Sequence, residues 1–209
     1  MGETSLPRWL EWAREIQALS QSGRHYSNNY YDQQRYKRLS TIAAEIVSQY
    51  SDLELGSLVD LYYAQNGYAT PRVDVRAAVF NDGKLLMVRE RIDGGWTLPG
   101  GWADVGDVPS EAAEREVWEE AGFQVKARKL IGVYDANRIG PLELFHAFKL
   151  VFLCDLVGGQ AQPSFETSEV AFFSFDEIPT ELSGERTKPR HIADAFTAYR
   201  DPDCSAKFD

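Results

Sequence analysis

The first third of the chain carries apolar residues at spacings of three and four, the pattern of amphipathic α-helices that bury one face. These apolar stripes cover residues 9–19, 36–50 and 55–63. Turn-forming residues separate and follow them, at 21–23, 51–52 and 66–67. The pattern predicts three helices within residues 6–66, in a small N-terminal helical domain over residues 1–68. Helices this short enclose little core, so we expect them to pack against the rest of the chain or a second copy.

Beyond Gly67–Pro71 the apolar positions alternate with polar ones, which is the period of a β-strand. Residues 73–80 show this alternation, Asn81-Asp82-Gly83 is a hairpin signal, and residues 84–91 form the expected return strand. Further strands are expected at 96–103, 123–135, 143–156 and 170–175, and helices at 109–121 and 189–200. Mixed strands with helices between and after them predict an α/β sandwich in a second domain over residues 69–209.

The composition is that of an ordinary globular protein, with 44% hydrophobic and 26% charged residues in a chain of 209. No apolar run reaches the ~18 residues needed to span a membrane, and the charged N-terminus differs from a secretory signal. Cys154 and Cys204 are expected to be free thiols in a reducing cytoplasm. We therefore expect a cytoplasmic protein without membrane contact.

The formal net charge of −10 bears on the ligands that the protein can bind. An acidic surface repels long polyphosphate chains such as duplex DNA, so nucleic-acid binding is not expected. A small phosphate-containing ligand stays compatible with this charge, because a bound metal ion supplies positive charge locally.

Three glutamates in the expected helix at 109–121 share one helical face. Glu116, Glu119 and Glu120 stand at i, i+3 and i+4. Carboxylates about 4 Å apart repel by roughly 4 kcal/mol at an effective dielectric near 20, and Arg115 is the only basic residue from 92 to 125. A hard divalent cation with oxygen ligands would offset that repulsion. The alternative interpretation is a solvated acidic helix face.

A glycine loop, Leu98-Pro99-Gly100-Gly101, precedes this helix. Glycine permits close backbone approach and unusual dihedral angles. A backbone carbonyl in the loop can therefore join the carboxylates on a metal ion, and amides at the helix N-terminus can face phosphate.

The stretch from Gly101 to Phe123 resembles the Nudix box, a motif with fixed Gly, Glu, Arg-Glu, Glu-Glu and Gly positions. The chain matches the motif at Gly101, Arg115, Glu116, Val117, Glu119, Glu120 and Gly122. It departs mildly at Phe123, and at Asp107 it has Asp where the family has a Glu that is thought to support the loop. The resemblance implies a Nudix α/β/α sandwich with a mixed sheet over about residues 70–180.

In the Nudix family this box is a loop–helix–loop that binds Mg²⁺, with Mn²⁺ as a substitute, and the pyrophosphate of the substrate. By this resemblance Glu116 and Glu120 bind the metal ion, and Glu119 is a third ligand. The Gly100 carbonyl is the expected backbone ligand. Arg115 is expected to orient the carboxylates rather than touch the substrate.

The implied reaction is hydrolysis of a nucleoside diphosphate linked to another group, X. The metal neutralises developing charge and lowers the pKa of a water molecule, and the products are a nucleoside monophosphate and phosphorylated X. A carboxylate takes the water proton, and in this family it often lies downstream of the box. Glu166 is favoured as this base, Glu169 is the second candidate, and a box glutamate such as Glu119 is the third. The alternative for either downstream residue is a surface charge.

Arginine is well suited to bind phosphate. Candidates on or beside the strands that lead into the glycine loop are Arg76, Arg89 and Arg91. Each of them is also compatible with an ordinary surface charge. Aromatic side chains that can stack on a base, or serve only in packing, are Trp96, Trp102 and Tyr134.

The N-terminal part carries a second resemblance, to the helical extension of one bacterial Nudix subgroup. The residues that carry it are Trp9-Leu-Glu-Trp12, His25-Tyr26, Tyr31-Asp-Gln-Gln-Arg35-Tyr36, Lys149-Leu-Val-Phe-Leu-Cys154 and Leu182-Ser-Gly-Glu-Arg186. Members of that subgroup are described as ADP-ribose or CDP-choline pyrophosphatases, and their helical part contributes to dimers. The resemblance implies a homodimer in which the helical domain serves dimerisation or covers the substrate.

Three functions stay open at this point. The first is a pyrophosphatase that acts on a small nucleoside diphosphate derivative. The second is an RNA-directed Nudix hydrolase that removes caps or trims 3′ ends, and the acidic charge argues against it. The third is a catalytically silent ligand sensor, and the intact Glu116, Glu119 and Glu120 argue against that.

Overall fold

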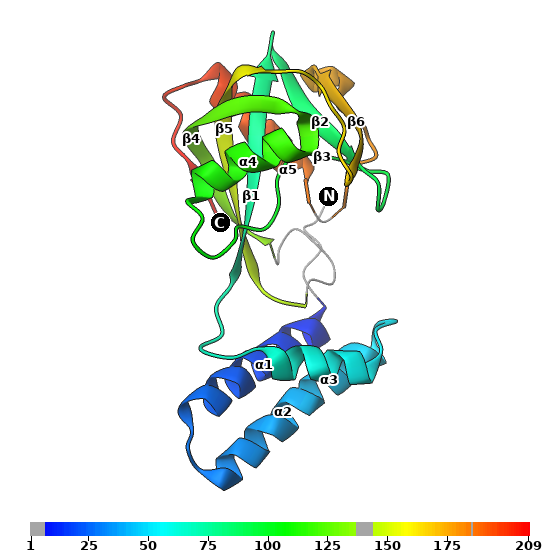
Figure 1. The fold of residues 1–209 in the computed structure, drawn as a ribbon, viewed down its shortest axis with the longest axis vertical. Helices are drawn as coiled ribbons and strands as arrows, with labels where there is room; N and C mark the ends of the chain where they lie inside the picture. Colours follow the sequence, from blue (N-terminus) through cyan, green and yellow to red (C-terminus); the bar gives the residue numbers. More distant parts are fainter. Residues whose placement is uncertain (1–6, 137–143, 185) are drawn as a thin grey trace. The chain divides into compact units, whose positions relative to one another are not determined.

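The computed structural model describes residues 7–136, 144–184 and 186–209, and it divides into two compact units (Figure 1). The helical unit contains the chain up to Pro71 together with residues 144–146. The α/β unit contains the other described residues, from Arg72 onwards. The chain therefore contributes to the helical unit a second time, through a short segment far along the sequence.

The helical unit consists of α1 (Arg8–Tyr26), α2 (Tyr30–Gln49) and α3 (Leu55–Ala64). Asn29 starts α2 because its side-chain oxygen accepts hydrogen bonds from two backbone amides of the first turn. The buried core consists of three alanines, two larger aliphatic residues and one tyrosine, namely Ala13, Ala43, Ala44, Val47, Leu58 and Tyr62. Phe145 joins this core, and its ring meets Tyr62 edge-on at 6.1 Å between centroids.

The expected break at residues 21–23 is wrong, because α1 continues through them to Tyr26. Gly23 serves close packing there rather than a turn. A Cβ atom at Gly23 would overlap the Tyr36 ring of α2. The glycine therefore lets two antiparallel helices approach, and the sequence signal for a turn has a packing origin.

The α/β unit is built around a mixed seven-stranded sheet. Its strands are β1 (Arg72–Asn81), β2 (Lys84–Glu90), β3 (Trp96–Thr97), β4 (Phe123–Asp135), β5 (Ala147–Gly159), β6 (Thr167–Phe173) and β7 (Lys207–Phe208). The strand order is β3-β2-β1-β5-β4-β7, with β6 paired to β2. Strands β1 and β5 are parallel, whereas β1–β2 and β4–β5 are antiparallel.

Two helices cover opposite faces of this sheet (Figure 1). Helix α4 (Pro109–Ala121) packs against a cluster that includes Val75 and Leu86. Helix α5 (Pro189–Arg200) packs against a second cluster that includes Leu85 and Met87. The expected α/β/α sandwich, preceded by a helical domain, is therefore confirmed.

Strand bounds differ from expectation beside the glycine loop. The expected strand at 96–103 has only its first two residues in β3, because the loop that follows pairs with β1 instead. The Val75 amide donates to the Gly101 carbonyl at 2.8 Å, and the Ala77 amide donates to the Pro99 carbonyl at 2.9 Å. The loop is thus held as an extension of the sheet.

Two other strands begin and end elsewhere than expected. Strand β6 covers Thr167–Phe173 rather than 170–175, because its pairing with β2 already includes Thr167. Strand β5 begins at Ala147 and runs to Gly159, since its last residues pair with the start of β4. The expected start at residue 143 lies outside the described residues. Among the helices of the described ranges, none is long and apolar enough to cross a membrane.

Four ionisable side chains meet inside the α/β unit. Asp74 binds Arg76 with both carboxylate oxygens, at 2.9 and 3.0 Å, and Lys149 Nζ lies 3.1 Å from Asp74 Oδ2. Arg76 and Lys149 are 3% and 1% exposed. Burial alone would raise the pKa of Asp74, but the two cations lower it. His191 is fully buried nearby, and its Nδ1 accepts a hydrogen bond from the Lys188 amide at 3.2 Å.

His191 is expected to make the protein sensitive to acid. Burial, reinforced by neighbouring cations, lowers its pKa to about 3, so the folded state keeps the imidazole neutral. The unfolded chain gains a proton below about pH 6.5, so stability is lost as pH falls from about 6.5 towards 3, by about 1.4 kcal/mol per pH unit. The charged groups that act on this imidazole are Lys149, Arg190, Asp74 and Arg76.

The variant His191→Asn tests this expectation, because asparagine keeps an acceptor near the Lys188 amide but does not titrate. Urea unfolding at pH 7 and pH 5 should show a smaller loss of stability for the variant than for the wild type. Equal losses in the two proteins would show that His191 does not control acid stability.

Candidate active site

Helix α4 directs its glutamates towards the glycine loop. The helix begins with Pro109, whose fixed φ suits a first helical position, and ends at Gly122, which has a left-handed φ of 74°. Ala113 and Val117 pack against the sheet, which leaves Glu116 and Glu120 at the edge of that buried face. Glu120 is buried, Glu116 is half-buried and Glu119 is exposed.

The glycine loop lies in contact with two of these carboxylates. The Gly100 amide donates to Glu120 Oε2 at 2.9 Å. Gly100 has a φ of 148°, and a Cβ atom there would overlap the Val75 carbonyl oxygen. A Cβ atom at Gly101 would lie 3.0 Å from Glu116 Oε2. Glycine is therefore required at position 100, whereas a side chain at position 101 would have to displace the Glu116 carboxylate slightly.

Four carboxylates influence one another at this place. Burial, with smaller contributions from Glu90 and Glu116, raises the pKa of Glu120 to about 8, although Arg76 and the Gly100 amide act to lower it. Burial also raises the pKa of Glu116 and of Glu90, and Glu166 raises both. Buried carboxylates with raised pKa values bind either protons or a cation. We call Glu90, Glu116, Glu120 and Glu166 the carboxylate cluster.

Arg115 connects Glu116 and Glu119 to the loop before the helix. Its Nη1 lies 3.0 Å from Glu116 Oε1 and 3.2 Å from Glu119 Oε2, and its Nη2 lies 3.2 Å from Asp107 Oδ2. Asp107 also accepts a hydrogen bond from the Asp104 amide at 3.0 Å. The shorter Asp at this position therefore still reaches Arg115 and braces the loop.

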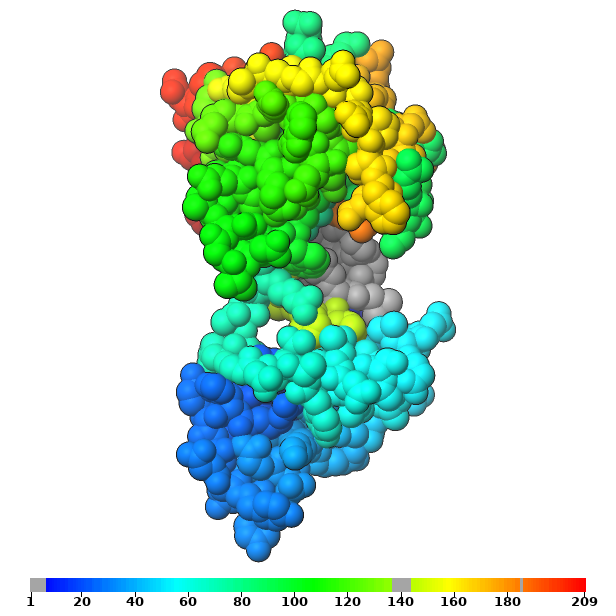
Figure 2. All heavy atoms as spheres, viewed as in Figure 1, coloured from blue at the N-terminus to red at the C-terminus, as the bar shows by residue number. Residues whose placement is uncertain are grey.

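The structure separates the two downstream glutamates. Glu166 lies beside the end of β2, because its carbonyl accepts from the Arg91 amide at 2.9 Å, and its charge raises the pKa of Glu90 and of Glu116. Glu169 forms an ion pair with Arg89 at 2.7 Å. In Figure 2 the segment that leads to Glu166 (yellow) lies beside α4 (green), in agreement with the 3.0 Å bond from the Gln162 amide to the Ala121 carbonyl.

The three candidate phosphate-binding arginines occupy different surroundings. Arg76 is buried, and besides its bonds to Asp74 it donates to the Leu98 carbonyl at 3.2 Å. Its position favours support of the loop over contact with substrate. Arg89 is partly exposed, and Arg91 is exposed at the end of β2.

The three candidate aromatic residues also differ. Trp96 is 8% exposed and packs edge-on against Phe173, with centroids 4.9 Å apart. Tyr134 is fully buried and donates to Asp194 Oδ2 at 3.0 Å. Both occupy packing positions. Trp102 is 45% exposed beside the glycine loop, so stacking on a base stays a prediction for this residue alone.

Sequence reasoning missed Glu90. It lies two and four residues after Val88 and Leu86, which pack on the α4 side of the sheet. The period of two along a strand could have placed Glu90 on that same face. Arg186, from the segment between β6 and α5, lies 3.2 Å from Glu90 Oε1. No periodic signal pointed to that contact.

A metal ion fits the chemistry of this site. Across residues 7–136, 144–184 and 186–209, no group of three His, Cys, Asp or Glu side chains stands ready to hold a metal. Mg²⁺ commonly takes only one or two carboxylates and keeps several waters. Glu116 and Glu120 offer two buried or half-buried carboxylates beside the Gly100 peptide, which matches that requirement.

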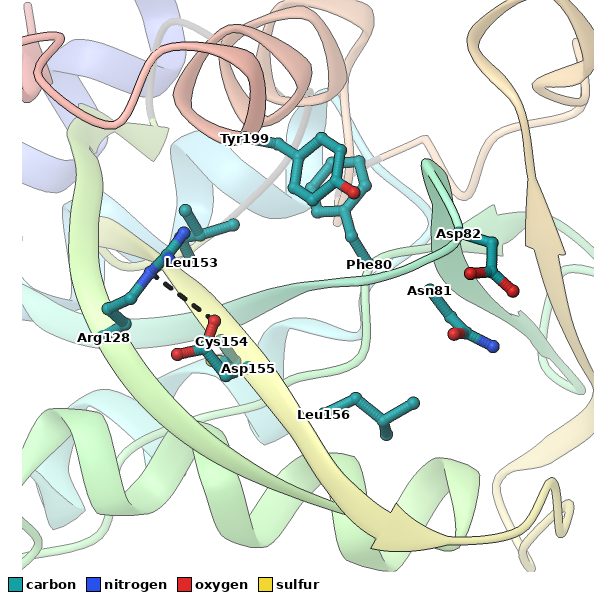
Figure 3. A pocket seen from close by; sticks show the side chains of 9 residues that line it. All are labelled: Phe80, Asn81, Asp82, Arg128, Leu153, Cys154, Asp155, Leu156 and Tyr199. Carbon is teal, nitrogen blue, oxygen red and sulfur yellow. Dashed lines mark ion pairs between the residues drawn. The ribbon is translucent and has the colours of Figure 1, made fainter.

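A cavity of about 300 Å³ lies at the other end of the β1–β2 hairpin (Figure 3). Phe80, Asn81 and Tyr199 line it, together with the ion pair between Arg128 and Asp155. Asn81 pairs with Lys84 at the hairpin tip, whereas Glu90 is the last residue of β2. The cavity is therefore separate from the carboxylate cluster.

Two family models match this chain. Residues 70–196 match the NUDIX domain. Residues 7–62 match the UDP-X-like N-terminal oligomerisation domain. Together these matches cover α1, α2, most of α3, strands β1 to β6, α4 and most of α5.

Individual relatives match along most of the chain. The Bacillus subtilis protein YjhB, provisionally named an ADP-ribose pyrophosphatase, is 36% identical over 97% of both chains. The crystal structure of an ADP-ribose pyrophosphatase from Streptococcus suis is 36% identical, with a TM-score of 0.60 over 67% of this chain and 100% of that one. The crystal structure of a UDP-X diphosphatase is 31% identical, with a TM-score of 0.63 over 96% and 98% of the two chains.

Proposed function

The chain belongs to the Nudix family and is a hydrolase of pyrophosphate bonds; from this premise we propose that its substrate is a small nucleoside diphosphate derivative of the ADP-ribose type. CDP-choline is an alternative in the same class. The products are a nucleoside monophosphate and a phosphorylated X group. The observation that carries the proposal is the buried Glu120 carboxylate, bonded to the Gly100 amide and close to two other glutamates.

Glu116 and Glu120 are the proposed ligands of Mg²⁺, with Glu119 and the Gly100 carbonyl as further ligands. A bound Mg²⁺ supplies charge neutralisation on the two phosphates and favours ionisation of a water molecule. Arg115 holds Glu116 and Glu119 in place through its two ion pairs. The Glu119 side chain is exposed, so it can turn towards a bound metal ion more easily than a buried side chain could.

Glu166 is the proposed general base, which removes the proton of the attacking water. Its charge raises the pKa of Glu116, and its backbone is fixed beside the end of β2 because its carbonyl accepts from the Arg91 amide at 2.9 Å. Glu169 is the second candidate, and its ion pair with Arg89 draws it away from this task. Glu119 is the third.

Arg89 and Arg91 are proposed to contact the substrate at the exposed end of β2. The roles are compatible with their partial and full exposure. For Arg76 we propose a supporting role through the Leu98 carbonyl, since its guanidinium is already bonded to Asp74.

The helical unit is proposed to form a homodimer or to cover the substrate. The match to an oligomerisation domain supports the first role. So does the exposure of large aromatic side chains around the α1–α2 connection, at Tyr26, Tyr30 and Tyr31. Such exposed apolar area is typical of protein interfaces.

The proposed function is tested by substrate turnover. Purified protein is incubated with Mg²⁺ and a panel of ADP-ribose, CDP-choline, UDP-sugars, dinucleotides, nucleoside triphosphates and a short RNA, and monophosphate release is measured. We expect turnover of one nucleoside diphosphate derivative and its loss on addition of EDTA. The variant Glu120→Gln should lower kcat by about 10²-fold, because it removes part of the charge that holds the metal.

The control variant is Glu181→Gln, which changes an exposed carboxylate outside the carboxylate cluster. Turnover of RNA with a steep loss at higher salt would favour the RNA-directed alternative. Tight binding of a nucleotide without turnover, under Mg²⁺ and Mn²⁺ alike, would favour a ligand sensor and contradict the proposal.

A further inference from the structure

Arg186 reaches the carboxylate cluster from the segment between β6 and α5. Its Nε lies 3.2 Å from Glu90 Oε1, and its Nη1 lies 3.3 Å from Ser183 Oγ and 4.0 Å from Asp93 Oδ2. The next residue, Thr187, accepts from the Leu98 amide at 2.9 Å, and Gly100, two residues further along that loop, donates to Glu120 Oε2 at 2.9 Å. Arg186 therefore approaches the proposed metal ligands through the glycine loop.

Two buried residues fix the backbone on either side of Arg186. The Ser183 amide donates to the Trp96 carbonyl at 2.9 Å, and the Thr187 hydroxyl accepts from the Leu98 amide at 2.9 Å. Both Ser183 and Thr187 are fully buried. The segment is thus clamped to β3 and to the first residue of the glycine loop, which places Arg186 at the rim of the site.

Three other arginines near the carboxylate cluster are held by acidic partners. Arg76 is buried against Asp74, and Arg89 is paired with Glu169. Arg115 is shared among Asp107, Glu116 and Glu119. Arg186 contacts the buried Glu90 with one edge of its guanidinium, and 34% of its side chain is exposed.

We propose that Arg186 binds a phosphate group of the substrate, an inference that rests on the proposed function. A diphosphate that enters a cluster of carboxylates needs a cation besides the metal to offset repulsion. Guanidinium carries five N–H donors in a planar fork that matches phosphate oxygens. Arg186 contacts Glu90 through Nε and Ser183 through Nη1. Its Nη2 can therefore donate to a phosphate oxygen while the ion pair with Glu90 stays in place.

The test uses Arg186→Gln and Arg186→Lys in the full chain. We measure kcat and KM on the best substrate of the panel, and the Kd of α,β-methylene-ADP by calorimetry with Ca²⁺ in place of Mg²⁺. Loss of a charge-assisted hydrogen bond should raise KM and Kd by about 10- to 100-fold in Arg186→Gln. Arg186→Lys should show a smaller rise, because lysine keeps the charge but loses the fork.

The control is Arg128→Gln, which breaks an exposed ion pair at the other end of the sheet. Thermal unfolding reports whether Arg186 acts only as the partner of Glu90. A lower melting temperature with unchanged KM and Kd would overturn the inference. If the wild type turned over none of the panel, the proposed function would fail, whereas the Kd measurement would still decide on Arg186.

Discussion

Replacement of Glu166 by glutamine is expected to lower kcat by about 10²- to 10⁴-fold, the usual contribution of a general base. Glutamine has nearly the same shape, but it cannot accept a proton from water. Glu166 is exposed, so the variant should keep the melting temperature of the wild type. Steady-state kinetics at saturating Mg²⁺ provides the measurement.

The position of Glu166 is well defined by neighbouring contacts. Its amide donates to Ser164 Oγ at 3.1 Å, and Ser164 in turn interacts with the Thr167 hydroxyl. That hydroxyl donates to the Glu120 carbonyl at 2.7 Å. One hydrogen-bond network therefore links the backbone of Glu166, the proposed base, to that of Glu120, the proposed metal ligand. The Glu166 side chain takes no part in this network, so its replacement leaves the backbone in place.

Glu169→Gln is the matched control for this experiment. The residue has the same chemistry three positions later, but it is paired with Arg89 at 2.7 Å. We expect its kcat to change by less than about tenfold, since its carboxylate is already paired with the Arg89 guanidinium. A large loss in Glu169→Gln together with a small loss in Glu166→Gln would reverse the assignment of the base.

Asp74→Asn is expected to destabilise the fold by about 3–5 kcal/mol, the usual result of removing one partner from a buried ion pair. Asp74 is 5% exposed and neutralises two buried cations, Arg76 and Lys149. The variant leaves those charges without their shared counterion. Urea unfolding followed by circular dichroism measures the change in the free energy of unfolding.

An exposed ion pair of the same unit provides the comparison. Arg128 and Asp155 lie 3.5 Å apart, with side chains 47% and 55% exposed. Asp155→Asn should therefore cost at most about 1 kcal/mol. A loss in Asp74→Asn no larger than the loss in Asp155→Asn would mean that the buried charges find other partners, and it would contradict the role given to Asp74.

Asp74→Asn should also affect the site. Arg76 donates to the Leu98 carbonyl, and Leu98 begins the glycine loop that touches Glu116 and Glu120. Loss of the brace is expected to lower activity at temperatures where the variant is still folded. A loss of activity without unfolding would therefore show that the buried ion pair supports the glycine loop.

The sequence identified the chemistry that depends on local spacing. Glu116 and Glu120 share a helical face because the helix has 3.6 residues per turn, and no distant residue can change that. The glycines at 100 and 101 could be assigned to close backbone approach because the absence of a Cβ atom is a property of the residue itself. The order of strands and helices, and hence the α/β sandwich, also followed from periodicity along the chain.

Predictions from local sequence were wrong where tertiary packing determines the role of a residue. Gly23 looked like a helix break, but it makes room for the Tyr36 ring of the next helix. Arg76 was predicted either to bind phosphate or to be a surface charge, but β1 lies in the middle of the sheet and buries it. A side chain's environment depends on neighbours distant in sequence, which no local pattern records.

The sequence by itself therefore determined the helix carboxylates, the glycine loop and the fold class, since each rests on short-range geometry. Only the tertiary structure paired Glu169 with Arg89, brought the charge of Glu90 close to Glu120, and carried Arg186 to Glu90. These contacts join β2 to α4, to β6 and to the segment before α5, which all lie later in the chain. Their arrangement follows from sheet pairing and burial, because folding brings charged groups together only where strand register and packing allow it.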